Sequence, residues 1–203
     1  MSSPEQTQLL FRRYQLAELF HIPLRDINLK ALLDSDYTTT ADDLGISLSE
    51  LEQVLAEPLD ERWQLLERRT PLPANTLRCA VASMDGEWIN GHFSRCPIMY
   101  VYDVCESGTS IVGLRKMPEE AGEIGHQERV NAINDCQLLF VAAIGGPAAA
   151  RVIRADIYPM KVRNVEAIDQ TLGRLCERLS SGSLPPWLKK VMGQSWQMAD
   201  WSA

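Results

Sequence analysis

The sequence lacks a CxxC pair, a basic stripe and a long apolar run. Its five cysteines are an odd number, which argues against a disulfide framework, a zinc knuckle and an all-cysteine iron–sulfur site. We therefore expect reduced thiols and a cytoplasmic protein. No run approaches the roughly 18 apolar residues that span a bilayer, and the first residues lack the basic start and apolar stretch of a secretion signal. The net charge of −7 argues against nucleic-acid contact.

Acidic charge is concentrated in the first third of the chain. Residues 1–70 hold 7 Lys/Arg and 13 Asp/Glu, whereas residues 71–203 hold 13 and 14, so the net charges are −6 and −1. Pro71 and Pro73 lie between these parts. Prolines interrupt a helix and favour extended backbone. We predict four regions: a helical protein-interaction domain over 1–70, a linker over 71–75, an α/β domain over 76–183 and a tail over 184–203.

The first 70 residues are expected to be all-helical. Ser3 can cap a first helix in which Pro4 takes the first position, and Pro23 ends it. Further short helices are predicted at about 27–33, 40–44, 48–56 and 59–68. Helices this short bury enough surface only by packing on each other.

Residues 39–51 also fit a helix-turn-helix, with Gly45 in the turn and Ser47 capping the second helix. That reading would make the protein a DNA-binding regulator. The second helix, however, carries Glu50, Glu52 and Glu57 and no Lys or Arg. It would meet phosphates with like charge, so DNA binding is the disfavoured alternative.

The second part of the chain reads as a mixed sheet with flanking helices. Apolar runs predict five strands, at 77–84, 98–104, 110–116, 137–144 and 157–162. The short turn at 106–109 predicts that the second and third strands are antiparallel. Helices are predicted at 127–135, 148–154 and 165–179.

A polar loop between the first two predicted strands carries His92. Strands at both ends of a loop can present its side chains in a fixed direction, and neutral imidazole is a common ligand of transition metals. The alternative is an ordinary loop histidine. Cys96 is a candidate second ligand because thiolate suits iron, although cysteine is more often a small buried hydrophobe. We expect His126 to be a capping-region or surface residue.

Gly145 and Gly146 precede Pro147 at the start of a predicted helix. Glycines allow close backbone approach, and free N–H groups at a helix start attract anions, although many such turns bind nothing. Arg151 could add positive charge at the same edge of the sheet. Arg154 is expected to lie on a solvated helix face.

Three motifs in order, DGEWINGHF at 85–93, PIMYVYDV at 97–104 and AAIGGPAAARV at 142–152, resemble the dinitrogenase iron-molybdenum cofactor-binding family. The resemblance covers about residues 75–165. It implies a ribonuclease H-like sheet and, as in two-domain members, an N-terminal domain resembling a sterile alpha motif. Many members have Gly after the His-Phe pair, where this chain has Ser94.

The resemblance implies a non-catalytic nitrogenase assembly protein. It would bind the iron-molybdenum cofactor or a precursor and associate with cofactor-free dinitrogenase and other assembly proteins. His92 would ligate the cluster, with five further site residues: Asn90, Phe93, Gly145, Gly146 and Arg151. A chaperone that stabilises apo-dinitrogenase without touching the cofactor is the main alternative. An enzyme ranks third because the strands carry almost no carboxylates for magnesium. Finished cofactor, molybdenum-free precursor and vanadium analogue all stay open as cargo.

The tail over 184–203 holds three of the five tryptophans, Trp187, Trp196 and Trp201. Tryptophan is enriched at protein interfaces. Trp187 and Leu188 could fold back over the sheet to complete the core. Trp196 and Trp201 lie among small and polar residues, so we expect them to be mobile and to be buried on the partner protein.

Overall fold

The computed structural model describes residues 4–58, 71–118, 122–182 and 184–199, with side chains from 8 to 192. The chain divides into two compact units, one of residues 1–67 with 85–87 and one of residues 68–84 with 88–203. Within the described ranges, no helix combines the length and apolarity that a membrane span requires. We describe each unit by itself.

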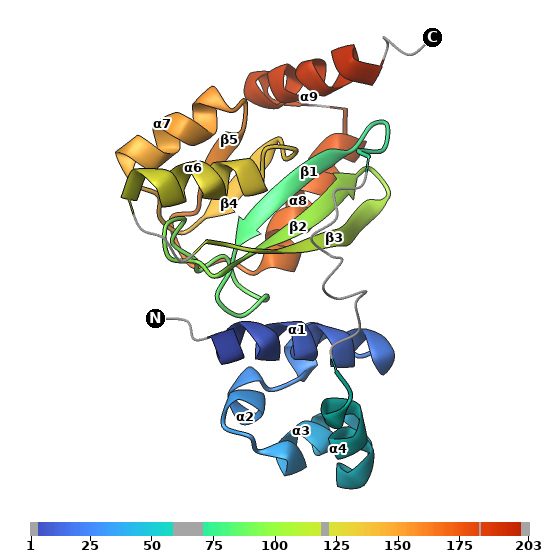
Figure 1. The fold of residues 1–203 in the computed structure, drawn as a ribbon. Helices are drawn as coiled ribbons and strands as arrows, with labels where there is room; N and C mark the ends of the chain where they lie inside the picture. Colours follow the sequence, from blue (N-terminus) through green and yellow to red (C-terminus); the bar gives the residue numbers. More distant parts are fainter. Residues whose placement is uncertain (1–3, 59–70, 119–121, 183, 200–203) are drawn as a thin grey trace. The chain divides into compact units, whose positions relative to one another are not determined.

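The first unit contains α1 (Pro4–Leu19), the 3₁₀ turn η1 (Leu24–Asp26), α2 (Leu29–Leu33), α3 (Tyr37–Leu44) and α4 (Leu48–Ala56) (Figure 1). Asn28, Asp36 and Ser47 cap α2, α3 and α4 by accepting hydrogen bonds from backbone N–H groups. The core of the unit consists of Leu16, Ile27, Leu32, Ala41, Leu44 and Leu51. The all-helical prediction is confirmed for the described residues, and the helix predicted at 59–68 lies outside them.

The second unit contains a five-stranded sheet in the order β3-β2-β1-β4-β5. Its strands are β1 (Leu77–Ala82), β2 (Ile98–Cys105), β3 (Gly108–Lys116), β4 (Leu138–Val141) and β5 (Tyr158–Lys161). β2 is antiparallel to β1 and β3, whereas β1, β4 and β5 are parallel. The predicted mixed sheet and its antiparallel hairpin are confirmed.

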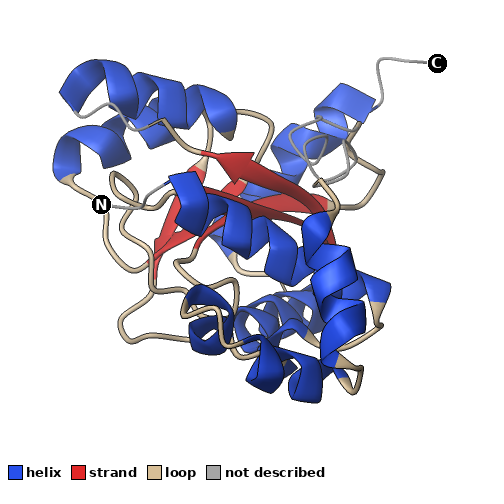
Figure 2. Ribbon diagram, turned by 60° about the horizontal axis from the view of Figure 1, so that its bottom comes forward, coloured by secondary structure: helices blue, strands red, loops and turns tan. Residues whose placement is uncertain are grey.

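Helices cover both faces of this sheet (Figures 1 and 2). α6 (Gly122–Ala132) and α7 (Gly146–Arg154) lie on one face, and α8 (Ile168–Ser180) contacts β2 and β3 on the other. Val130 of α6, Val152 of α7 and Leu139 of β4 belong to one buried cluster. α6 begins five residues before the predicted start at 127. Gly125 is buried inside the helix, where packing offsets its low helix propensity.

The tail forms a helix, α9 (Pro186–Ala199), which the sequence did not predict. Pro186 occupies its first position, where no backbone donor is needed. Leu188 and Val191 are buried, and the Trp187 ring stacks on Tyr158 of β5 with centroids 5.1 Å apart. The alternative in which Trp187 and Leu188 fold back over the sheet is therefore the observed one. The Trp196 side chain and Trp201 lie outside the described residues.

A buried ion network joins the amino ends of β1 and β4. Arg78 donates from Nε and Nη2 to the two carboxylate oxygens of Asp103, at 2.7 and 2.8 Å. Asp135 accepts from Arg78 at 3.1 Å and from Arg115 at 2.7 Å. Burial raises the pKa of Asp135, but the hydrogen bonds and charges of Arg115 and Arg78 outweigh it, so that pKa is lowered.

Candidate functional site

The His92 loop lies outside the carboxyl ends of β1 and β4, where open α/β sheets bind their ligands. The Gly91 N–H donates to Ala82 O at 3.0 Å, and Gly91 O accepts from Ala142 N at 3.1 Å. The Phe93 N–H donates to Ala143 O at 2.9 Å, so His92 and Ala143 form a parallel bridge. The backbone of His92 is therefore held from both strands, as the prediction of a fixed loop requires.

Gly91 allows the loop to approach β1 this closely. A Cβ atom at this position would lie 2.7 Å from Ala82 C, 2.8 Å from Ala82 O and 2.9 Å from Cys96 Sγ. Two of these atoms belong to backbone, so any larger residue would push the loop away from the strand. Sequence reasoning had not singled out Gly91. Its place immediately before the histidine was the only available signal.

The His92 side chain is half-buried and contacts Ser94 twice. Ser94 Oγ lies 2.9 Å from Nδ1, and the Ser94 N–H donates to Nδ1 at 3.2 Å. Because Nδ1 accepts from the Ser94 N–H, the neutral imidazole carries its proton on Nε2 in this arrangement. Ligation of a metal through Nε2 would require the other tautomer, in which Nδ1 carries the proton and the Ser94 hydroxyl accepts it. Burial lowers the pKa of His92, and the charges of Arg95 and His126 lower it further, so the imidazole is neutral at pH 7.

Two predicted site residues support the loop from within. Asn90 Oδ1 accepts a hydrogen bond from Met84 N at 2.8 Å and thereby closes the polar loop. Phe93 is fully buried against the sheet. The structure therefore gives Phe93 a supporting position and not one in direct contact with a ligand.

Cys96 also lies in the core. Its thiol is fully buried and donates to Ser83 O at 3.1 Å and to Ile98 O at 2.9 Å. This position matches the buried-hydrophobe alternative. We therefore leave Cys96 out of the proposed ligand set.

Arg129 of α6 holds the loop from the other side. Its side chain is buried, and its guanidinium donates to Phe93 O at 3.1 Å, to Cys96 O at 2.7 Å and to Pro118 O at 2.6 Å. Burial lowers the pKa of Arg129. A buried arginine that binds only backbone carbonyls has a positioning role. Sequence reasoning missed it because its two partners in the loop, Phe93 and Cys96, lie more than 30 residues away in the chain.

The Gly-Gly-Pro turn starts two residues after Ala143, at Gly145, and leads into α7, which begins at Gly146. Gly145 is the N-cap and supplies no side-chain cap, and the turn is exposed. A Cβ atom at Gly145 or Gly146 would meet nothing within 4 Å, so packing does not require glycine there. Arg151 follows on α7 and pairs with the exposed Glu123 of α6 at 3.1 Å. The predicted anion-binding residues thus follow directly in the chain from the strand end that holds His92.

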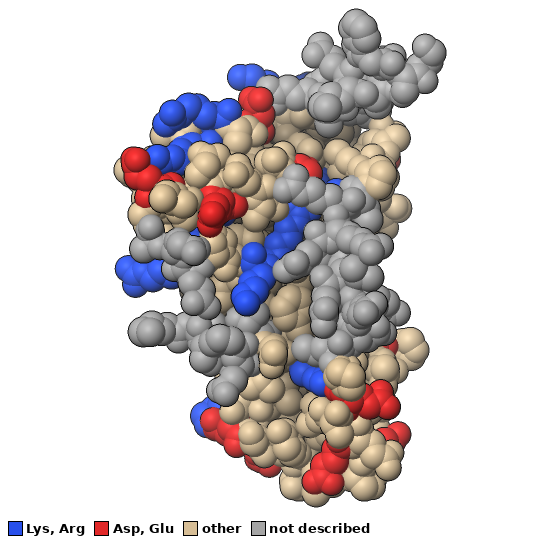
Figure 3. Space-filling model, in the orientation of Figure 1, with Lys and Arg blue, Asp and Glu red and all other residues tan. Residues whose placement is uncertain are grey.

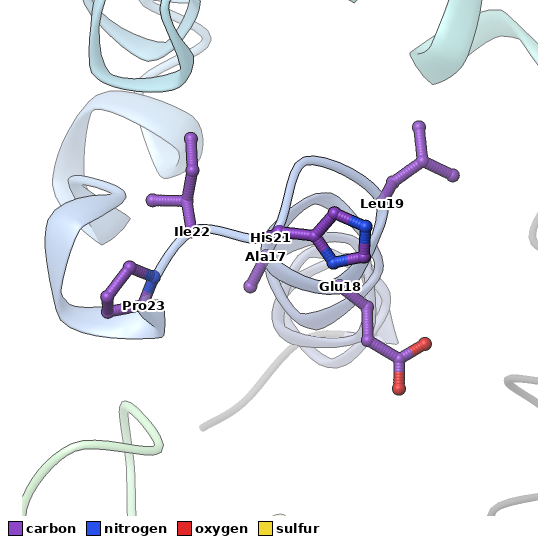
Figure 4. Close-up of a pocket in the computed structure, with 6 residues that line it drawn as sticks. All are labelled: Ala17, Glu18, Leu19, His21, Ile22 and Pro23. Atoms are coloured by element: carbon purple, nitrogen blue, oxygen red, sulfur yellow. The ribbon is translucent and has the colours of Figure 1, made fainter.

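Charge differs between the surfaces of the two units. Asp and Glu side chains form several patches toward the edge of the visible face of the first unit, among mostly uncharged residues, whereas both signs occur over α6 and α7 (Figure 3). The third histidine, His21, belongs to the helical unit, where it lines a pocket with Ala17, Glu18, Leu19, Ile22 and Pro23 (Figure 4). No group of three His, Cys, Asp or Glu side chains that could hold a metal ion occurs in the described ranges.

A family model described as dinitrogenase iron-molybdenum cofactor matches residues 75–178. The chain belongs to this family, which confirms the resemblance seen in the three sequence motifs. NifY of Klebsiella pneumoniae is 41% identical over 131 residues, 61% of this chain and 52% of that protein. NifX of Sinorhizobium fredii is 37% identical over 134 residues, 62% of this chain and 83% of that protein. The FeMo cofactor biosynthesis protein NifB of Bradyrhizobium diazoefficiens is 33% identical over 106 residues, only 21% of its length.

Proposed function

We propose that the protein is a cytoplasmic, non-catalytic carrier of the iron-molybdenum cofactor, or of a precursor cluster, in nitrogenase maturation. The observation that carries the proposal is His92, a neutral imidazole held in a fixed direction at the carboxyl edge of the sheet. Membership in the cofactor family and the name of the related NifB support the same role.

The site suits binding that is followed by release. His92 would ligate a metal atom of the cluster through Nε2 in the tautomer that carries its proton on Nδ1, where the Ser94 hydroxyl would accept that proton. The exposed start of α7, with Gly145 and Gly146, and Arg151 would attract the negative charge of the cargo. A site with so few protein ligands can pass the cluster on, whereas a cage of four ligands would retain it.

The strand order, with β2 antiparallel to its neighbours, supports a ribonuclease H-like assignment of the α/β unit. The capped short helices α2–α4 are compatible with a domain resembling a sterile alpha motif. We propose that this acidic unit, together with the tryptophan-bearing tail, contacts apo-dinitrogenase and other assembly proteins.

Replacement of His92 by Ala tests the carrier role. Full-length protein is mixed anaerobically with isolated cofactor, passed through a gel-filtration column and assayed for molybdenum and iron. We expect His92→Ala to weaken binding at least tenfold, about 1.4 kcal/mol, while thermal stability is retained. The matched control is His21→Ala, which removes a histidine from the helical unit and should bind as wild type does. Wild-type affinity in His92→Ala would refute the assignment of the ligand.

The same experiment distinguishes the chaperone alternative, which the acidic helical unit favours. A chaperone that never touches the cofactor would retain no molybdenum or iron. It would still form a complex with apo-dinitrogenase. Metal retained by the wild-type protein therefore supports the carrier, and its absence supports the chaperone.

A further inference from the structure

One face of α6 is turned toward the His92 loop, and the rotation of the helix about its own axis is fixed. Arg129 fixes that rotation, because its guanidinium bonds to the carbonyl groups of Phe93 and Cys96. Residues three apart share one face of a helix. His126 lies three residues before Arg129 on α6, so it is on the face that turns toward the loop.

His126 and Arg95 both lie near His92 with unused polar groups. The Arg95 N–H donates to His92 O at 2.9 Å, and His126 shares the face of α6 that Arg129 joins to the loop. After burial, the charges of Arg95 and His126 are the causes that lower the pKa of His92. His126 is half-buried, and within the described ranges its imidazole has no hydrogen-bond or ion-pair partner. The exposed guanidinium of Arg95 also has none there. The His126 imidazole and the Arg95 guanidinium therefore lie at the His92 loop without a partner among the described residues.

We propose that His126 is a second ligand of the carried cluster, which it binds from α6 while His92 binds from the loop. This inference rests on the proposed function. It also identifies the class of cargo. Two histidines with no third ligand beside them make a poor site for a free metal ion, since protein sites for such ions usually supply three or four ligands. A preassembled metal–sulfur cluster brings its own sulfide ligands and needs only one or two from the protein.

Arg95 adds a preference for negative charge. Because neither an aspartate nor a glutamate neutralises it among the described residues, its charge is available to an incoming anion. A neutral or cationic metal complex would gain nothing from this cation. The site therefore favours an anionic cluster held by two imidazoles.

The test uses the full-length protein and isolated iron-molybdenum cofactor under anaerobic conditions. The variants are His126→Ala and, as the matched control, Gln127→Ala, which changes the next residue on the exposed side of α6. Retained molybdenum and iron report affinity, and pulsed electron paramagnetic resonance reports the imidazole nitrogens bound to the cluster. Thermal unfolding checks that both variants are folded.

We expect His126→Ala to weaken binding about tenfold and to remove one of two imidazole nitrogen signals, while Gln127→Ala leaves both unchanged. Unchanged affinity with a single nitrogen signal in wild type and variant would overturn the second ligand and leave the carrier function standing. If wild-type protein retains no molybdenum or iron, the proposed function itself fails, and the second ligand fails with it.

Discussion

Two groups of charged side chains lie at opposite ends of the parallel strands, and they differ in how their charges are balanced. At the amino ends, Arg78 and Asp103 are buried, and each charge has a partner of opposite sign. At the carboxyl ends, Arg95 has no ion-pair partner among the described residues, and Arg151 has only the exposed Glu123. The first arrangement neutralises itself and contributes to register and stability. The second has positive charge left over, as expected where an anion binds.

The largest effect should come from breaking the paired network. Asp103→Ala leaves the Arg78 guanidinium, of which 1% is exposed, without its two-bond partner. Arg78 keeps one hydrogen bond to Asp135, so the loss should approach, without exceeding, the roughly 3–5 kcal/mol of a buried charge left unpaired, and urea unfolding should show it. The double variant Arg78→Met with Asp103→Leu removes both charges and should recover most of the stability. A loss under about 1 kcal/mol in the single variant would show that the pair is not structural.

A smaller loss is expected from Gly91→Ala in the His92 loop. The new methyl group would lie 2.7 Å from Ala82 C, so the loop must move away from β1. Overpacking of this kind costs about 1–3 kcal/mol. Cofactor binding should weaken as well, because the loop holds His92. The matched control is Gly145→Ala, where a methyl group meets nothing within 4 Å and stability should hold. Equal stability of the two variants would contradict the packing argument.

Ser94→Gly tests whether the Ser94 hydroxyl orients His92 at the carboxyl ends of the strands. We expect it to weaken cofactor binding and to leave the thermal stability unchanged. The hydroxyl lies 2.9 Å from Nδ1 of His92, and loss of a partner that orients a metal-binding histidine costs about tenfold in affinity. Ser94→Thr keeps the hydroxyl and should retain the wild-type affinity. The measurement is cofactor retention beside thermal unfolding. If Gly and Thr variants bind alike, the hydroxyl does not orient His92.

A change that depends on pH is expected from Asp135→Asn, which keeps one oxygen acceptor but removes the negative charge that Arg78 and Arg115 share. The lowered pKa of Asp135 means that its ionised form stabilises the fold above the unfolded-state pKa, near 4. That stabilisation is lost as the pH falls through the lower, folded-state pKa. The stability deficit of Asp135→Asn should therefore be largest near neutral pH and shrink toward pH 3. Unfolding curves at several pH values check this, and a constant deficit would contradict it.

Much of the fold could be predicted from local pattern. Apolar runs located the five strands, and the cap at Ser47 and the end of α3 at Gly45 stand where the sequence suggested. Two helices differ from the expectation. α6 begins at Gly122, five residues before the predicted start, and packing of the buried Gly125 there outweighs the low helix propensity of glycine. α9 was not predicted, although Pro186 at its first position is locally favourable.

By itself, the sequence determined the family, the mixed sheet with flanking helices and the histidine in a loop between strands, because these follow from contiguous motifs and local periodicity. Only the tertiary structure decided what surrounds that histidine. Gly91 fits against Ala82, Cys96 turns into the core, and Arg129 holds the loop from α6 beside His126. These contacts join segments far apart in the chain. They depend on how a helix lies across the sheet, which no short window of sequence specifies.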